Sequence, residues 1–287
     1  MLDTKVCDWE RGLMESRILH RESPSGEGVS IYCEVSGTGR PLVLGHSFLC
    51  SGAMWGPQLG PLSENCLVVN IDTRGHGRSG AVVEGFTIYD VVDDALAVLD
   101  DLGIGSAIWG GLSLGGMTAL RAATEHSARV DALILLDTNA GTDGSWARLK
   151  YRGMIAIAGL VGFRPLLSRA ISLMFGAETR RNAPELVAEW RGRFAAADVT
   201  SMRQTLRALN ARDDLVGRLD EITVPTLVMV GALDTPQPPA RSRLIAESIM
   251  DARFVEIPDA GHLSCLEQPG FVTSAILDFI HGLPDTA

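Results

Sequence analysis

The sequence predicts an α/β fold with a mostly parallel, twisted sheet and an inserted helical segment. Short apolar runs rich in Val, Ile and Leu alternate with longer stretches of helical periodicity. The runs are apolar on both faces, as expected for strands that are covered on two sides. The alternation stops over residues 141–214, which contain helical patterns only. With 287 residues, 46% of them apolar and 21% charged, the chain can bury a full core.

Each element can be justified in order along the chain. Residues 29–35 alternate apolar and polar side chains and precede a glycine pair, so we expect an antiparallel edge hairpin that turns into the next strand. The apolar runs predict strands at 41–44, 67–71, 106–109, 132–136, 226–230 and 254–257. Apolar residues at helical spacing predict helices over 91–102 and 117–123, each before the next strand.

Residues 141–214 interrupt this rhythm, and we expect them to form a helical cap insertion in a core made of 1–140 and 215–287. Pro184 suits the first turn of a helix, and Pro165 restarts another. The insertion carries twelve Lys and Arg against seven Asp and Glu. A basic insertion on an acidic core would draw an anionic substrate to their junction. The alternative is that these charges lie on solvated helix faces.

Composition and charge exclude several classes of protein. A net charge of −10 disfavours nucleic-acid binding. The longest apolar run, 154–163, is too short to cross a bilayer, and we expect no secretory signal or membrane anchor. The cysteines are odd in number and lack C-x-x-C spacing, which argues against a disulfide framework and favours a reducing, cytoplasmic compartment. They are Cys7, Cys33, Cys50, Cys66 and Cys265. Nothing in the sequence indicates the oligomeric state.

A serine between glycines is the strongest chemical feature. Residues 110–116 read Gly-Gly-Leu-Ser-Leu-Gly-Gly and contain the pattern G-x-S-x-G between a predicted strand and a predicted helix. A serine on such a sharp turn takes a strained backbone, and the flanking glycines remove Cβ atoms that would collide with the crossing chain. The turn presents the Ser113 hydroxyl at the C-terminal edge of the sheet, beside free N–H groups of the helix. A phosphate-binding loop is the alternative, but no G-x-G-x-x-G pattern supports it.

A serine hydroxyl is a weak nucleophile until a base takes its proton, and a histidine held by a carboxylate is the usual base. Ser113, Asp234 and His262 occur in that chain order, each just beyond a predicted strand. The C-terminal edge of an open α/β sheet is where sites form. Asp137 also follows a predicted strand and is the rival carboxylate, and Asp259 is a second one. We assign the role to Asp234.

With these residues in place, the sequence resembles the α/β-hydrolase superfamily over nearly the whole chain outside the inserted helices. The resemblance is carried by residues 44–48, 54–55, 71–79 and 110–116 and by the segments around Asp234 and His262. Residues 72–77, 111–117 and 262–269 are most similar to 3-oxoadipate enol-lactonases. Related esterases and cofactor-free haloperoxidase-type perhydrolases share most of these sequence segments.

The resemblance implies an oxyanion hole made by the backbone N–H groups of Leu114 and Phe48, each worth roughly 3 kcal/mol in the transition state. It also implies that Ser47 and Trp55 contact the substrate; the alternative for Ser47 is that it only adjusts the conformation of its loop. Most relatives have glycine where Ser47 stands, whereas the enol-lactonases resemble this chain in having serine. The inserted helices correspond to the superfamily's cap, and their apolar stretches 154–163 and 166–175 would line the pocket roof or pack against the core.

The residues predict a cofactor-free serine hydrolase of carboxylic esters, and the resemblance implies a lactone, an enol-lactone or a small ester as substrate. Two alternatives stay open: perhydrolysis or carbon–carbon cleavage on the same triad, and a ligand-binding receptor with a silent triad. Dehalogenases and epoxide hydrolases resemble this architecture but need an aspartate in place of Ser113, which excludes them. We expect no catalytic metal, because His46 and His76 lack metal-ligand spacing.

Overall fold

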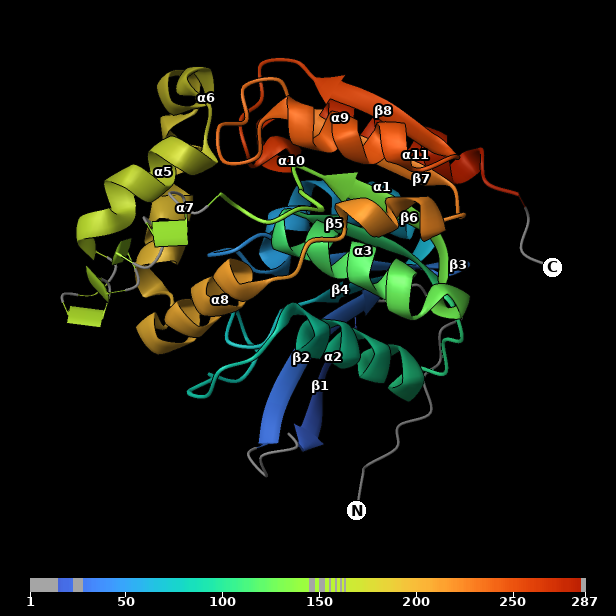
Figure 1. The fold of residues 1–287 in the computed structure, drawn as a ribbon, viewed down its shortest axis with the longest axis horizontal. Helices are drawn as coiled ribbons and strands as arrows, with labels where there is room; N and C mark the ends of the chain where they lie inside the picture. Colours follow the sequence, from blue (N-terminus) through green and yellow to red (C-terminus); the bar gives the residue numbers. More distant parts are fainter. Residues whose placement is uncertain are drawn as a thin grey trace.

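The computed structural model describes residues 15–22, 28–144, 148–149, 153–154, 156–157, 159–160, 162 and 164–284. Within these residues the strands form one eight-stranded sheet in the order β1-β2-β4-β3-β5-β6-β7-β8 (Figure 1). The strands are β1 (Glu15–Glu22), β2 (Gly28–Ser36), β3 (Arg40–Gly45), β4 (Cys66–Ile71), β5 (Ala107–Leu112), β6 (Val130–Leu136), β7 (Thr226–Gly231) and β8 (Ala252–Ile257). Neighbours among β3 to β8 pair in parallel, and β2 is antiparallel to both β1 and β4.

Helices cover both faces of the sheet, because the central strands are apolar on both faces. Along β3, Leu42 and Leu44 pack on the face covered by α1 and α11, and Val43 packs on the face covered by α2, α3 and α9. The α-helices are α1 (Gly56–Ser63), α2 (Ile88–Asp101), α3 (Leu114–Glu125), α5 (Leu167–Met174), α6 (Ala177–Asn182), α7 (Pro184–Ala196), α8 (Val199–Ala211), α9 (Pro239–Ser248), α10 (Ser264–Glu267) and α11 (Pro269–His281). Short 3-10 helices are η2 (Gly52–Trp55), η3 (Ser127–Arg129), η4 (Arg164–Leu166) and η5 (Val216–Glu221).

The strands predicted from apolar runs are confirmed as β3 to β8, and the predicted helices as α2 and α3. The predicted hairpin is wrong in its pairing. The strand at 29–35 is part of β2, which pairs with β1 and β4 and does not pair with β3. β3 lies between β4 and β5 because its side chains are buried on both faces, whereas the alternating pattern of β2 suits a place nearer the edge.

Between β6 and β7 the described residues form helices and no strand. Pro184 opens α7 in its first turn, as predicted, and η4 and α5 follow Gly162. Figure 1 shows α5, α6, α7 and α8 gathered at one side of the sheet, on the left of the view. Of the apolar stretch 154–163, residues 155, 158, 161 and 163 lie outside the described residues.

No helix in the described part of the chain is both long and apolar enough to span a membrane. The same part contains no cluster of three or more His, Cys, Asp or Glu side chains placed to hold a metal ion. Cys33, Cys50, Cys66 and Cys265 are buried free thiols, and Cys7 lies outside the described residues.

Candidate active site

Ser113 lies on the turn between β5 and α3, with a φ of 55° and a ψ of −105°. Its N–H donates to the Leu136 carbonyl at 2.9 Å, and its carbonyl accepts from the Met117 N–H at 2.9 Å and the Thr138 hydroxyl at 2.8 Å. These bonds to the neighbouring strand, its loop and the helix hold Ser113 in a backbone conformation that residues with a side chain rarely adopt. The turn therefore has the strained geometry that the sequence pattern predicts.

The glycine after the turn allows the elbow to pack directly against β3. A Cβ atom on Gly115 would lie 2.3 Å from the carbonyl oxygen of Gly45, which no side chain tolerates. The N–H of Gly115 donates to the His46 carbonyl at 3.1 Å. This contact between two backbones ties the Ser113 turn to the loop after β3, so that the two loops keep a fixed relative position.

His262 and Asp234 form a buried hydrogen-bonded pair, 2% and 4% exposed, with Nδ1 of the imidazole 2.8 Å from Oδ2 of the carboxylate. The other carboxylate oxygen accepts the N–H of Gln237 at 2.9 Å. Because a carboxylate only accepts hydrogen bonds, Nδ1 is assigned as the protonated nitrogen, which leaves Nε2 able to take a proton. Ser113 and His262 line the same cavity. Their side chains are not hydrogen-bonded to each other here, as is common before substrate binds.

Asp137, the rival carboxylate, has other partners. It is fully buried and accepts hydrogen bonds from the N–H at the end of β7, at 2.7 Å, and from the Ser264 hydroxyl. Burial and the neighbouring charge of Asp234 raise the pKa of Asp137 well above its usual range. Asp259 is exposed. The geometry therefore favours Asp234 as the partner of His262.

Two backbone N–H groups beside Ser113 have no hydrogen-bond acceptor among the described residues, those of Leu114 and Phe48. Leu114 is the first residue of α3, so its N–H belongs to the free positive end of the helix. Phe48 lines the cavity that contains Ser113. The Gly115 contact holds the start of α3 against the loop that carries Phe48, and both N–H groups are free to bind a negatively charged oxygen.

A cavity of about 110 Å³ lies beside Ser113 and His262. Its walls come from the loop after β3, from α3, from the helical segment and from the loop after β7. Its apolar wall is made of Phe48, Leu49, Met117, Met154, Ala170, Leu173, Met174, Leu206, Leu209 and Pro236. Ser47 also lines it, and its buried hydroxyl oxygen has no hydrogen-bond partner in the described residues.

Trp55 does not line this cavity, contrary to its expected contact with substrate. Its side chain is fully buried in the core on the α1 and α11 face of the sheet, and its indole N–H donates to the Gly45 carbonyl at 3.3 Å. The indole thus packs in the core against the end of β3 and stabilises that end of the strand.

The cavity is polar where the two ends of the helical segment meet. Nη2 of Arg212 lies 3.0 Å from Oδ2 of Asp143, and Nη1 of Arg241 lies 2.9 Å from Oδ1 of the same carboxylate. Arg212, Asp143 and Gln237 line the cavity, together with Asn210, whose side-chain oxygen has no partner among the described residues. Asp143 thus links Arg212, which lines the cavity, to Arg241, which does not line it.

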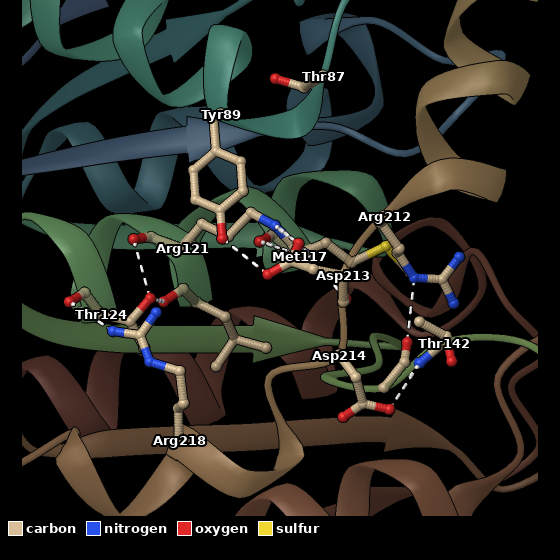
Figure 2. A network of polar contacts seen from close by, with 12 residues as sticks. Thr87, Tyr89, Met117, Arg121, Thr124, Thr142, Arg212, Asp213, Asp214 and Arg218 are labelled. Atoms are coloured by element: carbon tan, nitrogen blue, oxygen red, sulfur yellow. Dashed lines mark hydrogen bonds and ion pairs between the residues drawn. The ribbon is translucent and has the colours of Figure 1, made fainter.

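A buried arginine of α3 anchors the end of the helical segment (Figure 2). Arg121 is 1% exposed, and its Nη2 lies 2.6 Å from Oδ1 and 3.0 Å from the carbonyl oxygen of Asp213. The Tyr89 hydroxyl, from α2, donates to the other oxygen of that carboxylate at 2.8 Å. Figure 2 shows the side chains of Arg212 and Asp213 extending to opposite sides of the chain. The anchored Asp213 thereby positions Arg212 at the cavity.

Two buried histidines lie beside the loop after β3, with ring centroids 5.1 Å apart. Nδ1 of His46 bonds the Ser47 carbonyl at 2.8 Å and Nε2 accepts the Thr73 N–H at 2.9 Å, an arrangement that only a neutral imidazole can make. Burial lowers the pKa of His46. Burial and the nearby His46 lower the pKa of His76 to about 3.

The structure thus brings Ser113, Asp234, His262, Leu114, Phe48 and Ser47 to one edge of the sheet. The sequence reasoning missed Leu49, Asp143 and Arg212 as cavity residues. For the last two a signal was present, since the two ends of an insertion must meet and residues of opposite charge stand near both ends. No sequence pattern marked Leu49.

Comparison with known proteins gives consistent matches. The sequence pattern of the alpha/beta hydrolase fold family matches residues 40–269. The chain is 27% identical over 235 residues to 3-oxoadipate enol-lactonase 2 of Acinetobacter baylyi, covering 82% of this chain and 86% of that protein. A thermophilic esterase from Thermogutta terrifontis, solved with malate bound, superposes with a TM-score of 0.88 at 30% identity over 93% of this chain and 99% of that one. The enol-lactonase from Burkholderia xenovorans LB400 superposes with a TM-score of 0.84 at 29% identity over 92% and 100%.

Proposed function

The chain belongs to the alpha/beta hydrolase fold family, and from this premise we propose that it is a cofactor-free serine hydrolase of carboxylic esters, with a lactone, an enol-lactone or a small ester as substrate. The observation that carries the proposal is the buried His262–Asp234 pair, whose imidazole lines the same cavity as a strained serine at a helix N-terminus. The similarity to an esterase and to enol-lactonases supports the same class of reaction.

In this mechanism the Ser113 oxygen attacks the carbonyl carbon of the ester while Nε2 of His262 takes the hydroxyl proton. Asp234 holds the imidazole in the correct tautomer and stabilises the imidazolium that forms. The proton then passes to the leaving oxygen as its bond to the carbonyl carbon breaks, leaving an acyl group on Ser113. Water, deprotonated by the same imidazole, releases the acid. In a lactone, the leaving oxygen stays tethered to the acyl chain.

The tetrahedral intermediate carries a negative charge that must be stabilised at the site. The free N–H groups of Leu114 and Phe48 are the donors that we assign to it, each contributing roughly 3 kcal/mol in the transition state. The unpartnered hydroxyl of Ser47 lines the same cavity and is a third polar group available to substrate. These donors are fixed before the reaction, so little reorganisation is needed as charge develops.

We further assign the helical segment 141–214 as a cap over the core. Ala170, Leu173 and Met174 of α5 line the cavity, which supports the role expected for the apolar stretch 166–175. Met154, the first residue of the stretch 154–163, lines it as well. A cap that closes an apolar roof over Ser113 excludes water and so strengthens the electrostatic interactions beneath it.

The polar end of the cavity favours a substrate with an anionic or polar group. Arg212 lines this end of the cavity and pairs with Asp143, whose other oxygen binds Arg241, so the Arg212 guanidinium is the group that would attract a negatively charged substituent. We expect p-nitrophenyl hemisuccinate to be hydrolysed faster than p-nitrophenyl butyrate at low ionic strength, and the difference to shrink with added salt. Faster hydrolysis of the neutral ester at low salt would contradict this assignment.

The proposed function is tested by hydrolysis of p-nitrophenyl acetate, butyrate and octanoate, several lactones and an enol-lactone. Wild type, Ser113→Ala and Ser127→Ala are compared; Ser127 is an exposed serine at the start of η3, just beyond the C-terminal end of α3. We expect Ser113→Ala to lose about 10⁴-fold or more of the activity and Ser127→Ala to keep it. Full activity of Ser113→Ala would refute the proposal. Binding of a lactone without turnover by wild type would identify a receptor, and peracid formation from acetate and peroxide would identify a perhydrolase.

A further inference from the structure

Leu49 has a backbone conformation that is normally reserved for glycine. It is the third residue of a turn that starts at Ser47 and is closed by a bond from the Cys50 N–H to the Ser47 carbonyl at 3.1 Å. Its φ is +65°. A positive φ at this place in a turn selects glycine or asparagine, because a side chain on Cβ is strained there. A leucine kept at a strained position points to a role for its side chain.

Leu49 lines two cavities. On one side is the cavity of about 110 Å³ that contains Ser113 and His262. On the other is a polar cleft of about 440 Å³, formed by the loops after β3 and β4 and by α7 and α8. Among the residues described, Leu49 is the one that lines both. It is 7% exposed, and from its place in both linings we take its side chain as the boundary between them.

The catalytic cavity is small for a ligand site. Sites for drug-sized molecules commonly measure about 300–1,000 Å³, so about 110 Å³ suits only a short substituent. The cleft is larger than the catalytic cavity, and its lining includes the apolar residues Trp190 and Met202. Joining the two spaces would therefore let a substituent several carbons longer lie in line with the Ser113 oxygen.

We propose that Leu49 is a specificity-determining residue, whose side chain closes the catalytic cavity against the polar cleft and thereby limits the length of the substrate group that fits beside Ser113. The kinetic test of this inference depends on the proposed ester hydrolysis, whereas the binding test does not. Leu49 takes no part in bond making. It follows Phe48 directly, so the residue that closes the cavity adjoins an assigned oxyanion donor.

The kinetic test compares Leu49→Gly and Leu49→Ala with Leu206→Ala. Leu206 is a buried leucine of α8 that lines the catalytic cavity and does not line the cleft, so its truncation widens the cavity without joining the two spaces. The readout is the ratio of kcat/KM for p-nitrophenyl octanoate to that for p-nitrophenyl acetate. We expect both Leu49 variants to raise this ratio about tenfold or more, and Leu206→Ala to raise it by less than about threefold. An equal rise in all variants, or none at Leu49, would overturn the proposal.

A binding measurement keeps this inference separate from the proposed function. Octanoate binding is measured by calorimetry to Ser113→Ala and to the double variant Ser113→Ala, Leu49→Gly, neither of which needs to turn over substrate. We expect about tenfold tighter binding to the double variant. Equal affinities would refute the role of Leu49 even if Ser113 proves to be the nucleophile. Conversely, tighter binding together with full activity of Ser113→Ala would uphold Leu49 and refute the proposed mechanism.

Melting temperatures test the strain argument in the same variants. Glycine adopts a φ of +65° freely and alanine does not, so Leu49→Gly should melt at or above the temperature of Leu49→Ala. The opposite order would show that the turn does not store strain at this residue, and would remove the reason for regarding its side chain as selected.

Discussion

Lowering the pH from 7.5 to 5 is expected to destabilise the fold by about 2 kcal/mol through His76 alone. His76 is 3% exposed, and burial together with the nearby His46 lowers its pKa from 6.5 to about 3. The unfolded chain binds a proton at this imidazole as the pH falls below about 6.5, whereas the folded chain does not until about pH 3. The free energy of unfolding is therefore unaffected by His76 above about pH 6.5, and it falls progressively as the pH is lowered from there to about 3.

The magnitude follows from the interval between 6.5 and the working pH. Each unit is worth about 1.36 kcal/mol, so pH 5 removes about 2 kcal/mol of the free energy of unfolding. His46 acts in the same direction, because its pKa is also lowered by burial. The buried carboxyl of Asp137 acts oppositely, because its pKa is raised and the folded state takes up that proton first. The pH dependence of the free energy of unfolding of wild type contains the effects of His76, His46 and Asp137 together. A variant is therefore needed to isolate the effect of His76.

His76→Asn provides that variant. An asparagine amide can still donate to the Arg74 carbonyl, the bond that Nδ1 makes at 3.1 Å, but it does not titrate. Urea unfolding at pH 7.5, 6.5, 5.5 and 5.0 gives the free energy of unfolding for wild type, His76→Asn and His281→Asn, the last a change at an exposed imidazole. The loss between pH 7.5 and 5 should be about 2 kcal/mol smaller in His76→Asn than in the other two. If all three proteins lose the same amount, the assignment of a buried neutral imidazole is wrong.

Three further predictions concern the elbow, the two carboxylates and the anchor of the helical segment. Gly115→Ala should cost more than about 4 kcal/mol or yield no folded protein in thermal melting, because its Cβ would lie 2.3 Å from the Gly45 carbonyl oxygen. Asp137→Asn should keep kcat within about tenfold, whereas Asp234→Asn should lower it by about 10⁴-fold; equal losses would reopen the choice between them. Arg121→Met should lower the free energy of unfolding by about 2 kcal/mol or more in urea, and an unchanged midpoint would show that the ion pair anchors nothing.

The strands and the Ser113 turn were predictable from the sequence because their signals are local. A run that is apolar on both faces identifies a covered strand wherever it lies, and the glycines around Ser113 form a short pattern even though the Cβ atoms they lack would meet the turn itself, β3 and the loop after β6. The pairing of β2 was not predictable in the same way. Its alternating pattern indicates a half-covered strand but not the neighbour it pairs with, and β4, remote in sequence, took the place expected for β3.

The walls of the site depend on contacts between distant segments, and these the sequence did not reveal. Trp55 was assigned to substrate from the resemblance, yet the fold packs it against the end of β3. The polar end of the cavity arises because Asp143, near the start of the helical segment, forms an ion pair with Arg212, near its end. Each residue is unremarkable in its own stretch of sequence. Only their meeting beside Ser113 makes them part of a site.

Backbone strain connects these observations. The non-glycine residues with a positive φ in the described chain are Leu49, Ser113, Asp137 and Asp259, and each lies in a loop that carries or adjoins a site residue. A loop at the end of a sheet can aim a side chain into a shared space by leaving the common backbone regions, as Ser113 does, and the surrounding hydrogen bonds then hold the residue there. The G-x-S-x-G pattern predicted the strained backbone of Ser113. No pattern predicted that of Leu49, because a positive φ at that position of a turn is normally taken by glycine. A residue that breaks a local rule inside a site is where a functional role for the side chain should be sought first.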